Sequence, residues 1–486
     1  MKTNAEKLPS PWVSAIPLAV LTGLLYVVIR AFGGEAINGG SQIALLSATS
    51  VCVMLSIGIY RCRWAVLEEA IIDNIRASAS AIVILLLIGA IAGTWMISGV
   101  VPTMIYYGLQ ILHPSFFLVA SCAICAVVSL MTGSSWTTIA TIGVALMGIG
   151  QAMGFSEGWV AGAIISGAYF GDKLSLLSDT TVLASSTVGV PIFTHIRYML
   201  YTTVPSFVIA LAVFVIAGLT LDHTGGTHAG MYAESLRGTF RITPWLLAVP
   251  VATGVLIVRK LPAIVTLFCA AVFACIAMLL AQPELVAKVA GVGGLDFMSG
   301  FKGVLMSCFG PTAIPTGSPQ LDELVATRGM AGMLNTVWLI ICAMCFGGVM
   351  TGSGMLGALT SVFLRFVRRA FSAVASTVGA GIFFNLCTAD QYISIILSGR
   401  LFRELYAERG LEPRLLSRSV EDSATVCSVL VPWNSCGMTQ ATVLGVSTFV
   451  YMPYCIFNIV SPLMSLAVAA IGWKIKRAAG SAAHPH

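Results

Sequence analysis

Apolar segments close to the length of a membrane span recur along the whole chain. A helix of about 20 apolar residues crosses a bilayer, and segments near that length lie at 13–32, 41–60, 80–100, 160–190, 200–220, 243–258, 261–281, 334–358, 420–449 and 451–473. Polar residues interrupt two of them, 160–190 and 420–449. The pattern predicts an all-α polytopic membrane protein with about 10 full spans.

Two further apolar stretches, 114–150 and 371–406, are longer than one span and have a polar cluster in the middle. The clusters read "MTGSSWTT" and "CTADQYIS". An apolar arm, a polar tip and a second apolar arm are typical of a re-entrant hairpin. Such a tip is tolerated at membrane depth only where protein or a water-filled cavity covers it. The sequence therefore predicts two re-entrant hairpins.

The composition supports this membrane interpretation. Of the 486 residues, 57% are hydrophobic and 9% charged, whereas a soluble protein carries about 25% charged residues. The mean hydropathy is +0.93. We expect residues 1–486 to form a single transmembrane domain surrounded by membrane lipid. The formal net charge of +6 is not clustered on one helix or tail, so no nucleic-acid partner is indicated.

Several chemistries are not supported by the motifs. The N-terminal "MKTNAEKLPSPW" lacks the apolar core and cleavage site of a secretion signal, and we interpret it as a short cytosolic lead-in. The CxxC spacings at Cys122/Cys125 and Cys342/Cys345 lie in apolar segments without a second pair or a nearby histidine. They favour helix packing over a transition-metal site, and we expect no cofactor. HExxH is absent from the sequence, which argues against a zinc protease, and we expect no enzyme activity.

The basic residues predict the orientation, because cytoplasmic loops carry an excess of Lys and Arg. The loops 33–40, 101–113 and 150–158 contain neither. With a cytoplasmic N-terminus, most basic residues fall inside: Lys2, Lys7, Arg61, Arg63, Arg76, Arg197, Arg259, Lys260, Arg365, Arg368, Arg369, Arg400, Arg403, Arg409, Arg414, Arg418, Lys474, Lys476 and Arg477. We therefore expect a multi-pass protein of the bacterial inner membrane with both termini cytoplasmic.

This orientation makes the first hairpin open to the outside and the second to the cytoplasm. Each hairpin is followed by an interrupted span and a plain one, which is the inverted repeat common in secondary transporters. The first repeat is predicted at 80–220 (hairpin 114–150, broken helix 160–190) and the second at 334–473 (hairpin 371–406, broken helix 420–449). A shift of 256 residues aligns Thr132 with Thr388 and Trp136 with Tyr392.

Four polar breaks, 132–138, 172–181, 388–394 and 432–439, are expected to converge near the bilayer midplane. Unwound backbone in lipid costs several kcal/mol for each unsatisfied group, and a cation bound by carbonyl, hydroxyl and carboxylate oxygens offsets that cost. Hard cations prefer such oxygen ligands. The candidate ligands for Na⁺ or H⁺ are Asp179, Asp172, Thr180, Ser175, Ser178, Asp390, Asn434, Ser435, Thr132, Ser134, Ser135 and Thr388.

The acids at the breaks are the candidate proton carriers. Asp172 and Asp179 are two helical turns apart, so a break between them leaves Asp179 at the break and Asp172 on the preceding half-helix. A carboxylate at this depth can hold either a proton or Na⁺, and competition for one site is enough to exchange them. The proton-carrier candidates are Asp172, Asp179, Asp390 and Asp422, with Glu421 as a further acid at the second broken helix.

A structural interpretation of these residues stays open. Asp172 can pair with Lys173 or Arg197 as a purely structural contact. Glu421 and Asp422 adjoin an arginine-rich segment and can be interfacial. Ser and Thr in membrane helices commonly bond back to the helix or to a neighbour. His195 lies at the end of a span, where anchoring is the simpler role.

The motifs around these acids resemble a known family. "GAYFGDKLSLLSDTTVLASSTVGVPIFTHIRYMLYTT" (167–203) is similar to the signature of NhaC-type Na⁺/H⁺ antiporters. "ADQYISIILSGRLF" (389–402) and "LVPWNSCGMTQATVLGV" (430–446) resemble that family's two C-terminal signatures. The resemblance implies an ion-transporter fold with two hairpins and two broken helices enclosing the site. Residues that match the signatures are Asp172, Ser175, Asp179, Thr180, Asp390, Gln391, Trp433, Asn434 and Ser435.

The resemblance also implies exchange of Na⁺ for H⁺ by alternating access, with the two ions as the transported partners. Relatives in the family exchange malate and lactate together with these ions, so an organic acid or amino acid cargo stays an alternative. Leu176 stands where the family usually has proline, and Val182 where it has asparagine, which favours the alternative slightly. A channel fits less well, because two occluding hairpins suit alternating access. A homodimer is left open by the sequence.

Overall fold

The computed structural model describes residues 9–475 except 33–37, 222–225, 260, 295, 317–321, 323–324, 366 and 368. The described chain is almost entirely helical and contains no β-strand, only an isolated bridge between Thr312 and Thr327. Within it, eight helices are long and apolar enough to span a membrane, or up to ten if each of two bent helix pairs counts as one span. The expected all-α polytopic fold is confirmed.

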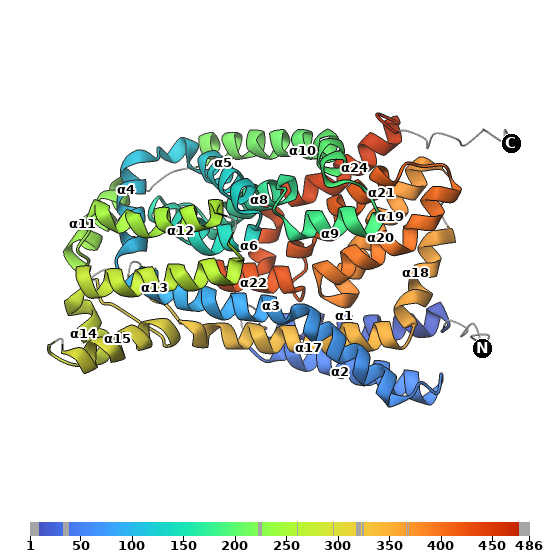
Figure 1. Cartoon of the computed structure of the whole chain (residues 1–486), viewed down its shortest axis with the longest axis horizontal. Coiled ribbons are helices and arrows are strands. Elements are labelled where there is room, and N and C mark those ends of the chain that lie inside the picture. The colour runs from blue at the N-terminus through green and yellow to red at the C-terminus, as the bar shows by residue number, and fades with distance from the viewer. Residues whose placement is uncertain are drawn as a thin grey trace.

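Most helices follow one another through short connections, and a longer one joins α15 to α17 (Figure 1). The first group is α1 (Pro11–Phe32), α2 (Gly40–Gly58), α3 (Trp64–Ile97), α4 (Val100–Ile111), α5 (Pro114–Thr132), α6 (Ser135–Thr138), α7 (Val144–Ala152) and α8 (Glu157–Leu174). The second is α9 (Asp179–Val188), α10 (Ile192–Thr220), α11 (Gly226–Thr239), α12 (Ala248–Val258), α13 (Ala263–Ala281), α14 (Pro283–Ala290) and α15 (Phe297–Phe309). The third is α17 (Leu334–Gly352), α18 (Met355–Arg365), α19 (Ala370–Thr388), α20 (Gln391–Glu408), α21 (Pro413–Val420), α22 (Ser435–Leu444), α23 (Thr448–Tyr451) and α24 (Ile456–Ile471).

The long helices form two layers with the broken helices between them. In Figure 1, α1, α2, α3 and α17 lie along the lower side, and α5, α8, α10 and α24 along the upper side. The short helices α9 and α22, which follow the two breaks, lie between these layers. No residue of the second break is exposed, whereas Leu176 and Leu177 are exposed at the first.

Close packing of α8 against α5 holds the first broken helix in place. A Cβ added at Gly167 would lie 2.0 Å from the carbonyl oxygen of Cys122, and one at Gly171 would lie 2.2 Å from that of Ala126. Only glycine permits this approach, as in other small-residue contacts between membrane helices. The contact fixes the end of α8, and thereby Asp172, beside the tip of the first hairpin.

Both polar clusters lie at a turn between two helices, and the shift of 256 residues relates the geometry of the two turns; that they are re-entrant hairpins stays a prediction. Helix α5 begins at Pro114 and α19 at Ala370, and each ends in a left-handed residue, Gly133 or Ala389. The Thr132 hydroxyl donates to the carbonyl of Ser134 at 3.2 Å, and the Thr388 hydroxyl to that of Asp390 at 3.1 Å. The same shift takes the start of α9 to the start of α22 and the glycine that ends α9, Gly189, to Gly445. The repeat boundaries 80–220 and 334–473 stay a prediction.

Several spans differ in their ends from the prediction, and two of the differences have a clear local cause. Helix α3 begins at Trp64, well before the expected residue 80, because residues 64–80 contain neither Gly nor Pro and include several helix-forming Ala and Glu residues. The span expected at 334–358 ends earlier, at Gly352. Gly354 has a φ of +74°, and a left-handed glycine just beyond the last turn ends a helix.

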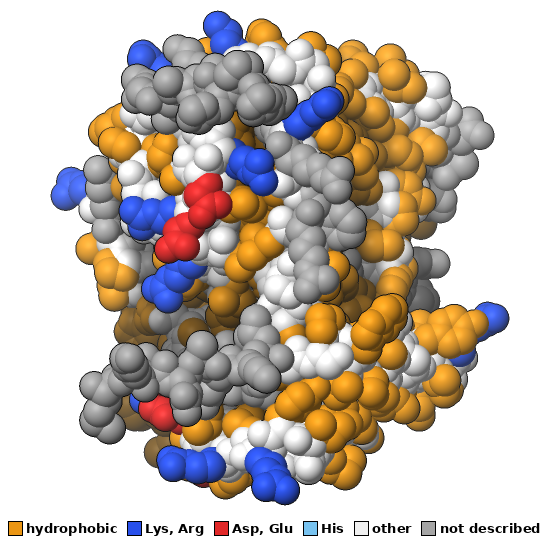
Figure 2. Space-filling model, turned by 90° about the vertical axis from the view of Figure 1, so that its right-hand side faces the viewer, with side chains coloured by type: hydrophobic (Ala, Val, Ile, Leu, Met, Phe, Trp, Pro, Cys, Tyr) orange, Lys and Arg blue, Asp and Glu red, His pale blue; other side chains and the backbone are white. Residues whose placement is uncertain are grey.

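Helix α1 begins and α24 ends at the same end of the molecule, on the right in Figure 1. Figure 2 shows Lys and Arg side chains gathered over that end. This agrees with the charge pattern used to orient the chain, although the membrane side of each terminus stays a prediction. Among the basic residues in that pattern, Lys2, Lys7, Lys260, Arg368, Lys476 and Arg477 lie outside the described residues, as does the side chain of Arg365.

Candidate functional site

The first broken helix unwinds between α8 and α9. Helix α8 ends at Leu174, and α9 starts at Asp179 with Ser178 as its N-cap. The Ser178 hydroxyl accepts a hydrogen bond from the backbone N–H of Thr181 at 3.4 Å, and serine is favoured at this position because it satisfies such a free donor. Ser175 caps the end of α8, and its hydroxyl accepts from the N–H of Leu177 at 3.2 Å.

Asp172, on the last turn of α8, is buried against the tip of the first hairpin. Its Oδ2 accepts hydrogen bonds from the backbone N–H of Ser135 at 3.1 Å and from the Ser135 hydroxyl at 2.8 Å. Its Oδ1 is buried and has no hydrogen-bond partner among the described residues. A buried carboxylate oxygen without a donor is costly, so this atom is available to a proton or a cation.

Glu421 provides a second buried carboxylate near the first break. It begins the π-helical turn η5 (Glu421–Thr425) that follows α21. The Thr180 hydroxyl donates to its Oε1 at 3.5 Å and lies 3.0 Å from the Ser178 hydroxyl. Its Oε2 is buried without a hydrogen-bond partner in the described chain. The charges of Lys173, Asp172 and Asp422 all act on this carboxyl group.

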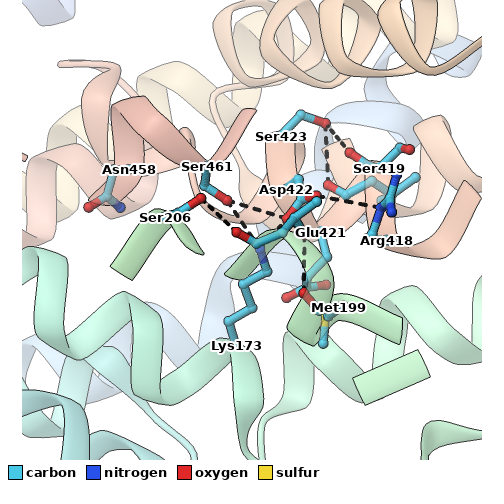
Figure 3. Close-up of polar contacts among 12 residues, drawn as sticks. Lys173, Met199, Ser206, Arg418, Ser419, Glu421, Asp422, Ser423, Asn458 and Ser461 are labelled. Atoms are coloured by element: carbon cyan, nitrogen blue, oxygen red, sulfur yellow. Dashed lines mark hydrogen bonds and ion pairs between the residues drawn. The ribbon is translucent and has the colours of Figure 1, made fainter. Parts of the chain in front are cut away.

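Lys173 and Asp422 form an ion pair that is fully buried. Figure 3 shows the lysine side chain extended toward Asp422 and Ser461. Its Nζ also donates to the Ser461 hydroxyl at 3.1 Å, and the Thr202 hydroxyl donates to Asp422 Oδ1 at 3.2 Å. Buried charges persist only when they are paired and hydrogen-bonded, and this pair joins α8, α10, η5 and α24.

Arg418 adds a second buried cation one turn before Asp422. Its Nε lies 3.9 Å from Asp422 Oδ2, and its guanidinium carbon lies 4.8 Å from the centre of the Tyr198 ring. None of its three side-chain nitrogens has a hydrogen-bond partner in the part of the chain that the structure describes. The ring face therefore stabilises a guanidinium group whose donors are free.

The second break is arranged around Asp390, the N-cap of α20. Asp390 Oδ1 accepts from the N–H of Ile393 at 3.0 Å, and Oδ2 accepts from the Ser435 hydroxyl at 3.2 Å. Asn434 caps α22, and its side-chain N–H donates to Asn385 at 3.2 Å. Unlike Asp172, Asp390 has a donor for each carboxylate oxygen.

Asp179 differs from the other acids because it is exposed. Its Oδ1 accepts from the N–H of Thr180 at 2.9 Å, and its Oδ2 accepts from the hydroxyl of Tyr392 at 2.7 Å. Tyr392 belongs to the first turn of α20, so this contact joins the first break to the tip of the second hairpin. Asp179 is thus exposed, while Asp172 and Glu421 are buried.

Two structural interpretations of these residues are wrong. Lys173 does not hold Asp172, because it pairs with Asp422 instead. Glu421 and Asp422 are fully buried and not interfacial, because α21 and η5 pack beneath α10, α19 and α20. His195 lies in the first turn of α10, buried and hydrogen-bonded to Ser417, which agrees with the expected anchoring role.

The predicted polar residues are divided among these sites. Asp172, Ser135, Ser175, Ser178, Thr180 and Glu421 surround the first break, and Thr388, Asp390, Asn434 and Ser435 the second. Thr132 and Ser134 bond within the first hairpin tip. Sequence reasoning missed the roles of Arg418 and Tyr392. The spacing of Arg418 and Asp422, one helical turn apart, was the available signal for the first.

The oxygen atoms at the first break suit a hard cation. Free carboxylate oxygens and hydroxyl groups are the ligands that such ions prefer. The described residues contain no group of three His, Cys, Asp or Glu side chains arranged to hold a metal ion. Free carboxylates beside broken helices in an apolar helical fold are the features of a polytopic membrane transporter.

The comparisons with known proteins agree with this class. A model of the Na⁺/H⁺ antiporter family matches residues 167–473. Over 425 residues the chain is 35% identical to the Na⁺/H⁺ antiporter NhaC of Alkalihalophilus pseudofirmus, which covers 87% of this chain and 89% of that protein. The chain therefore belongs to the Na⁺/H⁺ antiporter family and is of the NhaC type.

Relatives with other cargoes are about as similar. The malate-2H⁺/Na⁺-lactate antiporter of Bacillus subtilis is 35% identical over 439 residues, covering 89% of this chain and 88% of that protein. The arginine/ornithine antiporter ArcD of Halobacterium salinarum is 33% identical over 477 residues, covering 97% and 94%. These relatives are transporters and not enzymes.

Proposed function

We propose that this protein exchanges Na⁺ for H⁺ across the bacterial inner membrane by alternating access, with both termini in the cytoplasm. The two ions compete for the carboxylates of Asp172 and Glu421. The observation that carries the proposal is that Asp172 Oδ1 and Glu421 Oε2 are both buried without a hydrogen-bond partner in the described chain. A proton or a sodium ion would satisfy these oxygens, and each would displace the other.

The remaining charged residues take supporting roles in this proposal. Asp422 faces two cations, Lys173 and Arg418, so we assign it to balancing their charge and not to carrying the proton. The hydroxyls of Ser178 and Thr180 lie next to Glu421 and complete an oxygen shell around Na⁺. The exposed Asp179 receives the ion.

Purified protein in liposomes tests the proposal. An imposed Na⁺ gradient should move protons in the opposite direction, followed with an internal pH dye. The exposed Glu408 at the end of α20 offers a matched control: Glu421→Gln should abolish the signal and Glu408→Gln should retain it. A signal that persists in Glu421→Gln would contradict the assignment of the site.

A second candidate is exchange of an organic acid or amino acid coupled to these ions. The buried guanidinium group of Arg418, with no hydrogen-bond partner in the described chain, favours it, because arginine binds carboxylates with two parallel hydrogen bonds. The same liposome experiment distinguishes Na⁺/H⁺ exchange from exchange of an organic cargo. Proton movement that requires added malate, lactate or arginine supports the second candidate, and movement with Na⁺ alone supports the first.

A further inference from the structure

Equivalent positions of the two repeats carry the same two residue types in exchanged places. The shift of 256 residues takes Ser134, at the first hairpin tip, to Asp390 at the second. It also takes Asp179, the first residue of α9, to Ser435, the first residue of α22. Each repeat therefore has one Ser and one Asp at these positions. The first repeat has the acid on the helix, and the second has it on the hairpin.

The local geometry supports this equivalence. The hydroxyl of Thr138 donates to the Ser134 carbonyl at 3.0 Å, and that of Ser394 to the Asp390 carbonyl at 2.6 Å. The Ser134 hydroxyl accepts from the N–H of Thr137, as Asp390 Oδ1 does from that of Ile393. Both tips thus have one backbone geometry, and the two pairs can be compared atom by atom.

The two pairs are in different states in this structure. In the second repeat the Ser435 hydroxyl donates to Asp390 Oδ2 at 3.2 Å, and the Ser435 N–H donates to the carbonyl of Ala389 at 2.8 Å. Asp390 and Ser435 are each only 1% exposed. In the first repeat Ser134 is half-buried and Asp179 is exposed. An acid in a membrane segment faces water or protein and not lipid, and the exposure of Asp179 favours an aqueous entrance beside it.

We propose that Ser134–Asp179 and Asp390–Ser435 are equivalent gates, the first open and the second closed in this structure. Tyr392 is the positioning residue of the open gate, because its hydroxyl donates a 2.7 Å hydrogen bond to Asp179 Oδ2. In the opposite-facing state, Asp179 closes on Ser134 and Ser435 separates from Asp390. This inference rests on the proposed alternating access and adds the residues that carry it out.

An exchange of residue types tests the equivalence. Asp179→Ser should lower Na⁺-driven proton movement by about tenfold or more, equivalent to the loss of one strong interaction. Adding Ser134→Asp to it gives the first gate the chemistry of the second and should restore most of the rate. As a control, Thr137→Asp with Asp179→Ser places an acid on the same tip at a non-equivalent position and should not restore it. If Ser134→Asp restored no more than Thr137→Asp, the two gates would not be equivalent.

A labelling experiment tests the gates without measuring transport. Asp179→Cys and Ser435→Cys are made separately in membrane vesicles of both orientations. A membrane-impermeant thiol reagent is added, and peptide mapping distinguishes the new cysteine from native ones. Asp179→Cys should react from one side only and Ser435→Cys from the other side only. Reaction of both from the same side, or no reaction of Ser435→Cys from either side, would overturn the proposal.

The two experiments separate the gates from the proposed cargo. Opposite-sided labelling without Na⁺-driven proton movement in the unmodified protein would leave the gates standing and refute the proposed cargo. Na⁺-driven proton movement with labelling of both cysteines from the same side would support the proposed cargo and refute the gates.

Discussion

The hydroxyl of Tyr392 donates a 2.7 Å hydrogen bond to Oδ2 of Asp179, across 213 residues of sequence. It joins the tip of the second hairpin to the start of α9. Hydrogen bonds to an ionised group are about twice as strong as neutral ones, so this contact holds the exposed Asp179 carboxylate in one position.

Removal of the Tyr392 hydroxyl should weaken the binding of Na⁺ more than it slows the transport of bound Na⁺. In Tyr392→Phe we expect the Na⁺ concentration for half-maximal exchange to rise about tenfold, since a hydrogen bond to a charged group contributes about 1.5–3 kcal/mol. The maximal rate should change little. Exchange in liposomes over a range of Na⁺ concentrations measures both, with Tyr106→Phe on α4 as the control. A fall in the maximal rate alone would assign Tyr392 to a later step.

The Lys173–Asp422 pair should be needed for stability because it is fully buried. Lys173→Met leaves Asp422 with Arg418 at 3.9 Å as its nearest cation, and loss of one partner of a buried pair costs about 3–5 kcal/mol. Thermal unfolding of the detergent-solubilised protein measures this cost. The double variant Lys173→Met with Asp422→Asn should not recover it, because Arg418 then loses the buried carboxylate with which it pairs. Equal melting temperatures for wild type and Lys173→Met would refute the pairing.

Arg418 should matter less for stability than Lys173, although both are fully buried. Its guanidinium nitrogens have no hydrogen bonds to lose within the described chain, and Asp422 keeps Lys173 when Arg418 is replaced. We expect Arg418→Met to lower the melting temperature by less than Lys173→Met does. The reverse order, measured under the same conditions, would show that Arg418 is the main partner of Asp422.

The contact between α5 and α8 offers a test of the fold that positions Asp172. Gly167→Ala places a Cβ 2.0 Å from the Cys122 carbonyl oxygen, and such overpacking costs about 1–3 kcal/mol. Gly23→Ala on α1 is the matched control, because a Cβ there meets nothing within 4 Å. Thermal unfolding should show a clear loss for Gly167→Ala and none for Gly23→Ala. Similar melting temperatures for the two variants would contradict the close approach.

Much of the fold could be predicted from the sequence because lipid imposes a simple rule. Long apolar segments must be helices, and polar clusters inside them must be breaks. The clusters around Ser175 and Asn434 therefore marked the two interrupted helices, and those around Gly133 and Ala389 the hairpin tips. The exact start of α3 was missed because its first turns lie in a polar, helix-forming segment that hydropathy does not detect.

The site could be predicted only in part because its contacts cross long stretches of sequence. Lys173 and Asp422 are 249 residues apart, and no local spacing indicates that they meet. The hydropathy pattern predicts Asp179 at the break, but it does not indicate that Asp179 is exposed while Asp172 is buried. Arg418 was assigned to a cytoplasmic loop because arginine is rare in membrane segments, yet α21 carries it into the buried cluster.

The most direct test of the central claim is whether Na⁺ binding releases protons from the purified protein. In weakly buffered detergent solution near neutral pH, addition of Na⁺ should release protons from the wild type, because the ion displaces them from Asp172 and Glu421. Asp172→Asn and Glu421→Gln should each reduce the release strongly, and Glu408→Gln should leave it unchanged. No release from the wild type, or an undiminished release from both Asp172→Asn and Glu421→Gln, would contradict the account.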